Sequence, residues 1–127
     1  MHTKKYYHIT DSNNVQSILS TGIQCNNKTA HSPFMSSSVA FDKHQDYTDR
    51  TGVPDVVFIC EDPVLALAKM GSYTPVYRLS VIVVELPEDV VLKPSWCYEF
   101  ELLHSGTIDP KYIVDSLYYT DFERVTA

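Results

Sequence analysis

The longest strongly apolar stretch of the chain, Leu79–Leu86, limits what the chain can fold into. It is interrupted by the charge of Glu85, and it is much shorter than the roughly 20 consecutive apolar residues that a membrane-spanning helix needs. Together with the residues from Val76 onward it is rich in β-branched side chains, which predicts the strongest β-strand of the chain. We therefore expect a fold built around a sheet and no membrane-spanning segment.

Length and composition predict one compact domain covering residues 1–127. Hydrophobic residues make up 44% of the chain and charged residues 20%, which is close to the average for globular proteins. A chain of this size buries about two thirds of its extended surface on folding, so metal ions and disulfides are not needed for stability. The three cysteines are widely spaced without a CxxC pair, and no apolar leader follows the N-terminal lysines. These features predict a cytoplasmic protein with reduced thiols and no metal.

The first elements are predicted to be a strand and a short helix. Residues 5–10 are aromatic and β-branched, which is typical of a strand. Asp11–Asn14 is a cluster of helix-capping residues, followed by Val15 and Ile18 at helical spacing and by Gly22 as a stop. A brief extended segment is expected at residues 23–25.

The second half of the chain is predicted to be mainly extended. Asp55–Cys60 has the composition of a buried strand, and Asp62 with Pro63 forms a good start for a helix that Gly71 ends. Further extended segments are expected at residues 87–92 and 96–103, and a short helix at residues 110–113. Strands outnumber helices without β-α-β alternation, so we expect an α+β domain.

Charge is unevenly distributed along the chain, whose net charge is -6. Residues 1–54 carry five basic and four acidic side chains (+1), whereas residues 55–127 carry five basic and twelve acidic ones (-7). An acidic protein is poorly suited to extended binding of nucleic acid, whose affinity depends largely on lysine and arginine. A small anionic ligand held by the N-terminal part remains compatible with this distribution.

His8 is the first candidate functional residue, because a strand and a capped helix fix its backbone from both sides. Strand alternation directs Tyr7 and Ile9 to one face and Tyr6, His8 and Thr10 to the other. We expect His8 and Thr10 to point into a polar cleft or solvent. Taken alone, a partly exposed strand histidine with a satisfied hydrogen bond is the simpler interpretation.

Glu99 and Glu101 are the second candidate, because residues at i and i+2 of a strand share a face. Their repulsion is tolerated on a solvated edge, which is the ordinary interpretation. In a functional site, one carboxylate would bind a substrate hydroxyl and the other would stabilise developing positive charge. Phe58, in the strand before the second helix, is either a core residue or an aromatic surface in a cleft.

Taken in order, these segments resemble the small ADP-ribosyltransferase-like family. Tyr6–Thr10 followed by Asn14–Ile23 is similar to the start of DarT-type DNA-modifying transferases. Val57–Ala66 resembles the strand and helix that place an aromatic residue or serine near the nicotinamide. Glu99–Ile113 resembles the final motif, a catalytic glutamate on a strand followed by Ile-x-Pro-x-x-Ile. The resemblance implies two small, mostly antiparallel sheets that form a split β core with short N-terminal helices.

The resemblance also implies an activity: an NAD-dependent mono-ADP-ribosyltransferase that uses NAD as co-substrate and no metal. His8 would contact a ribose hydroxyl, with the main chain at Ile9 near the nicotinamide amide and Thr10 beside them. Glu101 would hold the nicotinamide-ribose 2′-hydroxyl and stabilise the oxocarbenium-like charge as the glycosidic bond breaks. Glu99 would help to orient the acceptor, and the two glutamates exchange roles if the register is shifted by two residues.

The chain departs from the family pattern in two places. Phe58 stands where a tyrosine or serine is more usual, and a phenylalanine stacks but does not hydrogen-bond. No arginine adjoins the first motif to hold the pyrophosphate, a role left to Arg50, Lys43 or Lys5. Residues 26–54 form a long polar segment that we expect to cover NAD, since such segments in a compact domain are usually functional.

Several functions therefore remain open. The acceptor of ADP-ribose is a protein side chain, a nucleobase or a small molecule, and the small size fits a toxin or phage-type effector. An RNA 2′-phosphotransferase is an alternative that the negative charge disfavours. The other alternative is a non-catalytic module that binds a nucleotide or a protein, which the unusual Phe58 motivates.

Overall fold

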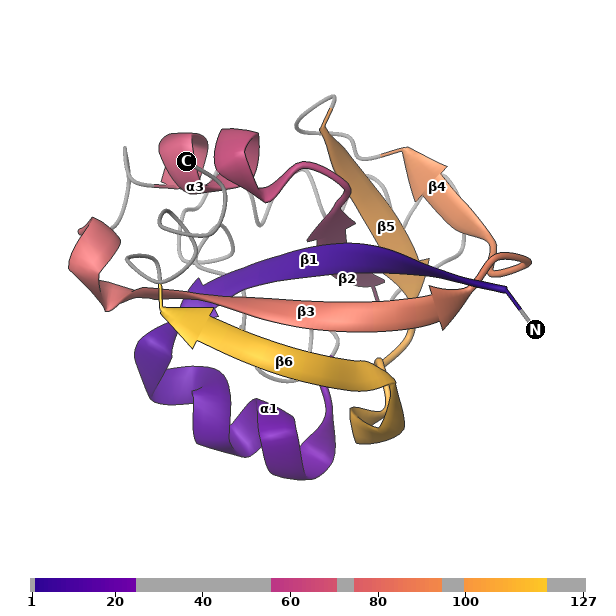
Figure 1. Cartoon of the computed structure of the whole chain (residues 1–127), viewed down its shortest axis with the longest axis horizontal. Helices are drawn as coiled ribbons and strands as arrows, with labels where there is room; N and C mark the ends of the chain where they lie inside the picture. Colours follow the sequence, from indigo (N-terminus) through magenta and orange to yellow (C-terminus); the bar gives the residue numbers. More distant parts are fainter. Residues whose placement is uncertain (1, 25–55, 71–74, 95–99, 119–127) are drawn as a thin grey trace.

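The computed structural model describes residues 2–24, 56–70, 75–94 and 100–118 (Figure 1). Its helical elements are η1 (Ser12–Asn14), α1 (Val15–Thr21), α3 (Pro63–Met70), η3 (Val76–Arg78) and η4 (Pro110–Tyr112). Its strands are β1 (Thr3–Asp11), β2 (Val56–Cys60), β3 (Leu79–Pro87), β4 (Leu92–Pro94), β5 (Glu101–Ser105) and β6 (Ile113–Tyr118). No helix within these ranges is long and apolar enough to cross a membrane.

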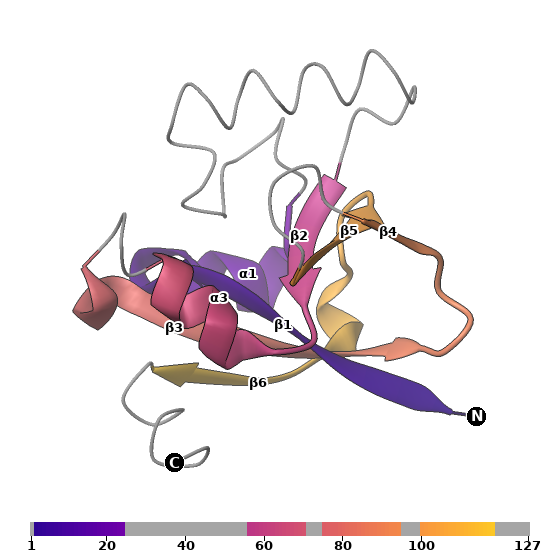
Figure 2. The same ribbon diagram turned by 90° about the horizontal axis from the view of Figure 1, so that it is seen from above.

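The described strands form one six-stranded antiparallel sheet in the order β4-β5-β2-β1-β3-β6. β1 pairs with β3 along its whole length, from Thr3↔Pro87 to Asp11↔Leu79. Between β1 and β2, in contrast, the register consists of the single pair Tyr7↔Cys60. The sheet is thus made of two halves, β4-β5-β2 and β1-β3-β6, which we call the β2 half and the β1 half. Figure 2 shows the β2 half standing steeply against the β1 half.

The expected α+β class is confirmed, but the expected pair of separate sheets is not what the described strands form. They make one sheet, because the Tyr7↔Cys60 pair links the two halves. The link is narrow, and most of the hydrogen-bonded pairing lies within each half.

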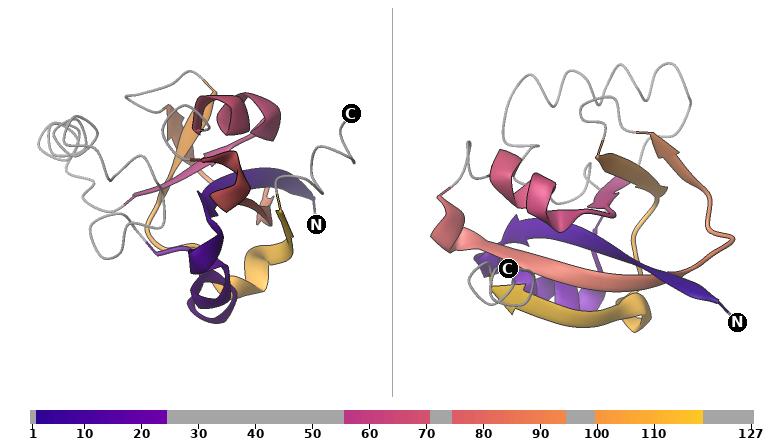
Figure 3. Two further views of the ribbon diagram at one scale, coloured as in Figure 1. Left: turned by 90° about the vertical axis from the view of Figure 1, so that its left-hand side faces the viewer. Right: turned by 45° about the horizontal axis from the view of Figure 1, so that its top comes forward.

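Two apolar cores fill the two faces of this sheet, as alternation along the strands requires. α1 lies on one face and α3 on the other, beside β1 (Figure 3). The core on the α1 side includes Tyr6, Ile18, Val57, Ile59, Ile82, Val84 and Leu86. The core on the α3 side includes Ile9, Cys60, Ala66, Leu67, Leu79 and Val81. Residues of β2 contribute to both cores, so packing joins the halves where pairing does not.

The predicted caps at Asp11, Asp62 and Gly22 are confirmed, whereas Gly71, expected to end the second helix, lies outside the described residues. The Asp11 side chain accepts a hydrogen bond from the Asn13 amide at 2.9 Å, and the Asp62 side chain accepts one from the Val64 amide at 3.0 Å. α1 ends at Gly22, whose φ of 86° is easily adopted only by glycine. The chain then forms an isolated bridge between Ile23 and Ile108 instead of the short strand expected there; residue 25 lies outside the described residues.

Three expected boundaries are wrong. Val76–Arg78 forms a 3-10 turn before β3, with the Arg78 amide bonded to the carbonyl of Pro75 at 2.9 Å. The segment expected to be extended at residues 87–92 turns after Pro87, whose carbonyl accepts from the Val90 amide at 3.0 Å, before β4 begins. β5 begins at Glu101 and not at residue 96, because Phe100 lies in a turn; residues 95–99 are outside the described part.

Candidate functional site

His8 lies where the two halves of the sheet separate. Its ring Nδ1 is 2.7 Å from the carbonyl oxygen of Phe58 on β2, and the side chain is only 2% exposed. Because a carbonyl only accepts hydrogen bonds, Nδ1 is the donor and carries a proton. This side-chain bond occurs one residue beyond the Tyr7↔Cys60 pair. His8 therefore joins β1 to β2 at the point where backbone pairing between them ends.

The register confirms that Tyr6, His8 and Thr10 share a face, since they pair with Val84, Ile82 and Ser80 of β3. The expectation that His8 and Thr10 reach solvent is wrong, because both side chains are buried.

The reason for this burial is that α1 and its apolar core cover the face. Thr10 is also tied to the following turn, since its Oγ1 accepts a hydrogen bond from Asn14 Nδ2 at 3.2 Å.

Glu101 is the first residue of β5 and is buried, with 4% of its surface exposed. It pairs with Cys60, which in turn pairs with Tyr7, so these three residues form a row across β5, β2 and β1. Strands in a sheet lie about 4.8 Å apart, which places the ends of the row about 10 Å apart. Burial of a carboxylate is costly, and such groups are concentrated at functional sites.

The pKa of Cys60 is shifted by its surroundings, which include Glu101. Its pKa is raised to about 12, first by burial and then by the negative charges of Glu101 and Asp62. Its thiol donates a hydrogen bond to the Tyr7 carbonyl at 3.4 Å. Cys60 is therefore a neutral thiol at physiological pH and is unsuited to act as a nucleophile.

Strand alternation decides which candidates meet. Phe58 pairs with Leu103 and shares a face with Glu101, two positions along each strand. His8 follows Tyr7 and so points to the opposite face from the row that contains Glu101. The carbonyl of Phe58 nevertheless lies on His8. In β2, the backbone carbonyl of Phe58 thus contacts His8, while the side chain of Phe58 lies on the same face as Glu101.

Ile9 packs into the α3-side core and pairs with Val81. The remaining expected residues, Glu99, Arg50 and Lys43, lie outside the described residues, as does the proposed cover at 26–54.

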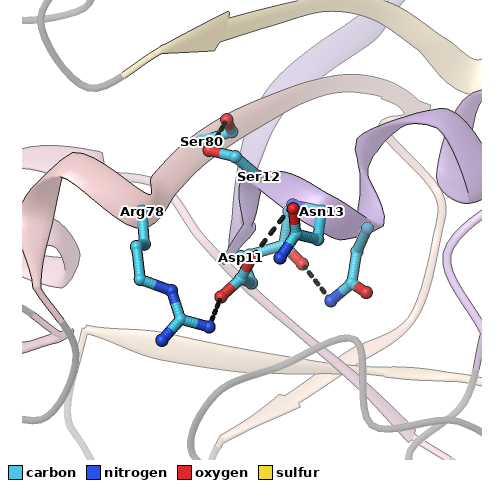
Figure 4. A network of polar contacts seen from close by, with 7 residues as sticks. Asp11, Ser12, Asn13, Arg78 and Ser80 are labelled. Atoms are coloured by element: carbon cyan, nitrogen blue, oxygen red, sulfur yellow. Dashed lines mark hydrogen bonds and ion pairs between the residues drawn. The ribbon is translucent and has the colours of Figure 1, made fainter.

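A polar network at the end of β1 contains an arginine that the sequence did not reveal (Figure 4). Arg78 Nη2 lies 2.6 Å from Asp11 Oδ2, and the Arg78 side chain is about half exposed. Beside this ion pair, the hydroxyls of Ser12 and Ser80 are 2.7 Å apart. Arg78 is 67 residues from Asp11 in the chain, and only the pairing of Asp11 with Leu79 brings it to the first motif. No local signal marks it.

In the part of the chain that the structure describes, no group of three or more histidine, cysteine, aspartate or glutamate side chains is arranged to hold a metal ion. No protein-family model matches the chain, and no curated protein or solved structure matches it significantly.

Proposed function

We propose that the protein is an NAD-dependent mono-ADP-ribosyltransferase, with Glu101 as its catalytic carboxylate. The observation that carries the proposal is the burial of Glu101 at the start of β5, on the same face as Phe58 and close to the separation of the two half-sheets. A fixed anion in such a place lowers the barrier to a cationic transition state without having to reorganise. The single pair that links the halves is the feature of the one sheet that most resembles the split core implied by the resemblance.

In this proposal Glu101 holds the nicotinamide-ribose 2′-hydroxyl and stabilises the oxocarbenium-like charge as the glycosidic bond breaks. Phe58 is itself buried, with 5% of its surface exposed, and its aromatic ring would stack on a planar ring brought to the face that it shares with Glu101. His8 is buried on the opposite face of the sheet from Glu101, so the contact with a ribose hydroxyl that the resemblance implies for it would require the ring to become exposed when NAD binds. Ile9 and Thr10 would complete the NAD contacts, and Glu99 would orient the acceptor.

Arg78 would help to hold the pyrophosphate, the role that was expected for Arg50, Lys43 or Lys5. It is a half-exposed cation at the end of the strand that carries His8, and arginine binds phosphate oxygens in bidentate geometry. Its ion pair with Asp11 would orient the guanidinium before NAD arrives. The acceptor is a macromolecule or a small molecule, and a role as toxin or phage-type effector belongs to the same proposal.

Release of nicotinamide from NAD tests the proposal directly. We expect the wild-type protein to release nicotinamide, and Glu101→Gln to slow the release by about 100-fold or more, as the loss of one key transition-state group does. Glu85→Gln is the matched control, because it is the same substitution on β3 of the same sheet, and it should leave the rate within about twofold. Thermal melting shows that each variant is folded. A folded Glu101→Gln protein with the wild-type rate would exclude the assigned role.

A non-catalytic module is the second candidate, and the His8–Phe58 hydrogen bond favours it. That bond gives His8 a role in holding β1 to β2 that does not require a nucleotide. Calorimetry with NAD separates the two functions, because heat of binding with no nicotinamide release supports the module. If NAD neither binds nor turns over in the presence of a cell lysate, the transferase proposal fails.

A further inference from the structure

A groove of about 530 Å³ lies on the α3 side of the β1 half, where the chain leaves β2 and enters α3. Residues from four elements and the connection before α3 line it: Lys5, Tyr7, Glu61, Asp62, Pro63, Val64, Val83, Val114, Asp115 and Leu117. Tyr7 lies in the row that contains Cys60 and Glu101, so the groove adjoins the candidate site. His8, Phe58 and Glu101 are not among its lining residues.

The groove combines an apolar floor with an apolar rim. Tyr7, Val83 and Leu117 provide partly or fully buried surface from three adjacent strands. At the rim, Val64 is 53% exposed and Val114 is 49% exposed. Single exposed apolar side chains are common, but here two of them, one on α3 and one on β6, line the same groove. An aliphatic or aromatic group placed there would remove both from water.

The charges in the groove are mainly negative. Glu61, Asp62 and Asp115 face one cation, Lys5. Among the described residues each carboxylate has a hydrogen bond: Glu61 accepts from Lys4 Nζ at 2.8 Å, Asp62 from a backbone amide of α3 and Asp115 from the next backbone amide. A carboxylate has two oxygens and about four acceptor positions. These hydrogen bonds therefore leave acceptor capacity at each of them.

We propose that this groove binds a basic side chain of a protein partner, carried on a segment with apolar neighbours. The aliphatic stem of an arginine or lysine would lie on Tyr7 and Val83, and its charged end would meet Asp62 and Asp115. An anionic ligand would face three carboxylates, and a second copy of this chain would bring a net charge of -6. Charge complementarity therefore selects a cationic occupant. The inference does not depend on the proposed transferase activity.

Fluorescence anisotropy with a labelled hexapeptide of alternating leucine and arginine tests the proposal. Asp115→Asn should weaken its binding by about two- to fivefold, and the Asp62→Asn/Asp115→Asn double variant by about tenfold, in line with partly exposed ion pairs. Asparagine still caps a helix, so α3 should persist. Asp89→Asn, in an exposed turn, is the matched control for these variants. Val114→Ser should also weaken binding of the peptide, and Val91→Ser is its control because Val91 is an exposed valine outside the groove.

Higher salt concentration should also weaken binding of the peptide, because salt screens ion pairs near the surface. A peptide with glutamate in place of arginine should not bind measurably. The proposal is overturned if the arginine peptide does not bind, or if it binds the double variant as tightly as the wild type. Equal losses in Asp115→Asn and Asp89→Asn would also overturn it, since they would show attraction to the overall negative charge instead of the groove.

Discussion

The strongest structural prediction concerns His8, because its ring joins the two half-sheets. His8→Ala removes a buried hydrogen bond of 2.7 Å and deprives the Phe58 carbonyl of this donor, which costs about 1–3 kcal/mol. Loss of the buried ring's packing adds about 1 kcal/mol. For a chain of this length each kcal/mol lowers the melting temperature by about 3–5 °C. We therefore expect the melting temperature to fall by about 6–20 °C.

Thermal denaturation followed by circular dichroism measures this change, with His104→Ala as the matched control. His104 Nδ1 also bonds to a carbonyl, but that of Gly106, only two residues away. Its loss would not separate two parts of the sheet, so the melting temperature should change by less than about 4 °C. Hydrogen exchange adds a local readout, because amides of β1 and β2 should lose protection in His8→Ala more than those between β1 and β3.

The reasoning would be refuted if His8→Ala melted as the control does and the protection of β1 and β2 were unchanged. A folded His8→Ala protein also informs function. If the rate of nicotinamide release falls by more than the folded fraction does, His8 contacts NAD as proposed. If the rate falls only in proportion to the folded fraction, His8 acts through the sheet alone.

Three further outcomes are expected. Gly22→Ala should lower the free energy of unfolding by about 2–4 kcal/mol in chemical denaturation, because both the φ of 86° and a nearby backbone carbonyl oppose a Cβ. Gly106→Ala is the control: its φ is 79° but the space around it is open, so the substitution should cost about 1–2 kcal/mol. Because the pKa of Cys60 is raised from 9.0 to about 12, its stabilising contribution should be lost as pH rises through that interval, so melting of Cys60→Val should depend less on pH there. Arg78→Gln should lower stability by less than about 1 kcal/mol, as for a half-exposed ion pair with Asp11, but weaken NAD binding at least about fivefold by calorimetry.

Elements governed by local chemistry were predictable from the sequence. Asp11 and Asp62 cap helices because their side chains reach amides two residues away, and Gly22 ends α1 because glycine accepts a positive φ. The strand that carries His8 and the apolar strand from Leu79 onward were also predictable, since alternation and β-branching are properties of neighbouring residues.

Long-range features were not predictable in this way. Tyr7 pairs with Cys60 across 53 residues, and nothing near either residue indicates that pairing stops there. The Arg78–Asp11 contact and the burial of His8 both follow from the register of β1 against β3 and β2. Glu101 could be named as a candidate from its motif, but its depth in the fold depends on the strands beside it.

The narrow link between the half-sheets has a consequence for how the chain acquires its structure. The β1 half draws its strands from residues 3–11, 79–87 and 113–118, and the β2 half from residues 56–60, 92–94 and 101–105. The halves are interleaved along the chain, so no continuous fragment contains one half without part of the other. During synthesis β1 cannot pair until β3 has been made, about 70 residues later, and β2 cannot pair with β5 until more than 40 further residues have been made. We therefore expect slow folding, because most pairing joins residues far apart in the sequence. Although the two halves of the sheet share only one residue pair, they cannot be expressed as two separate continuous fragments.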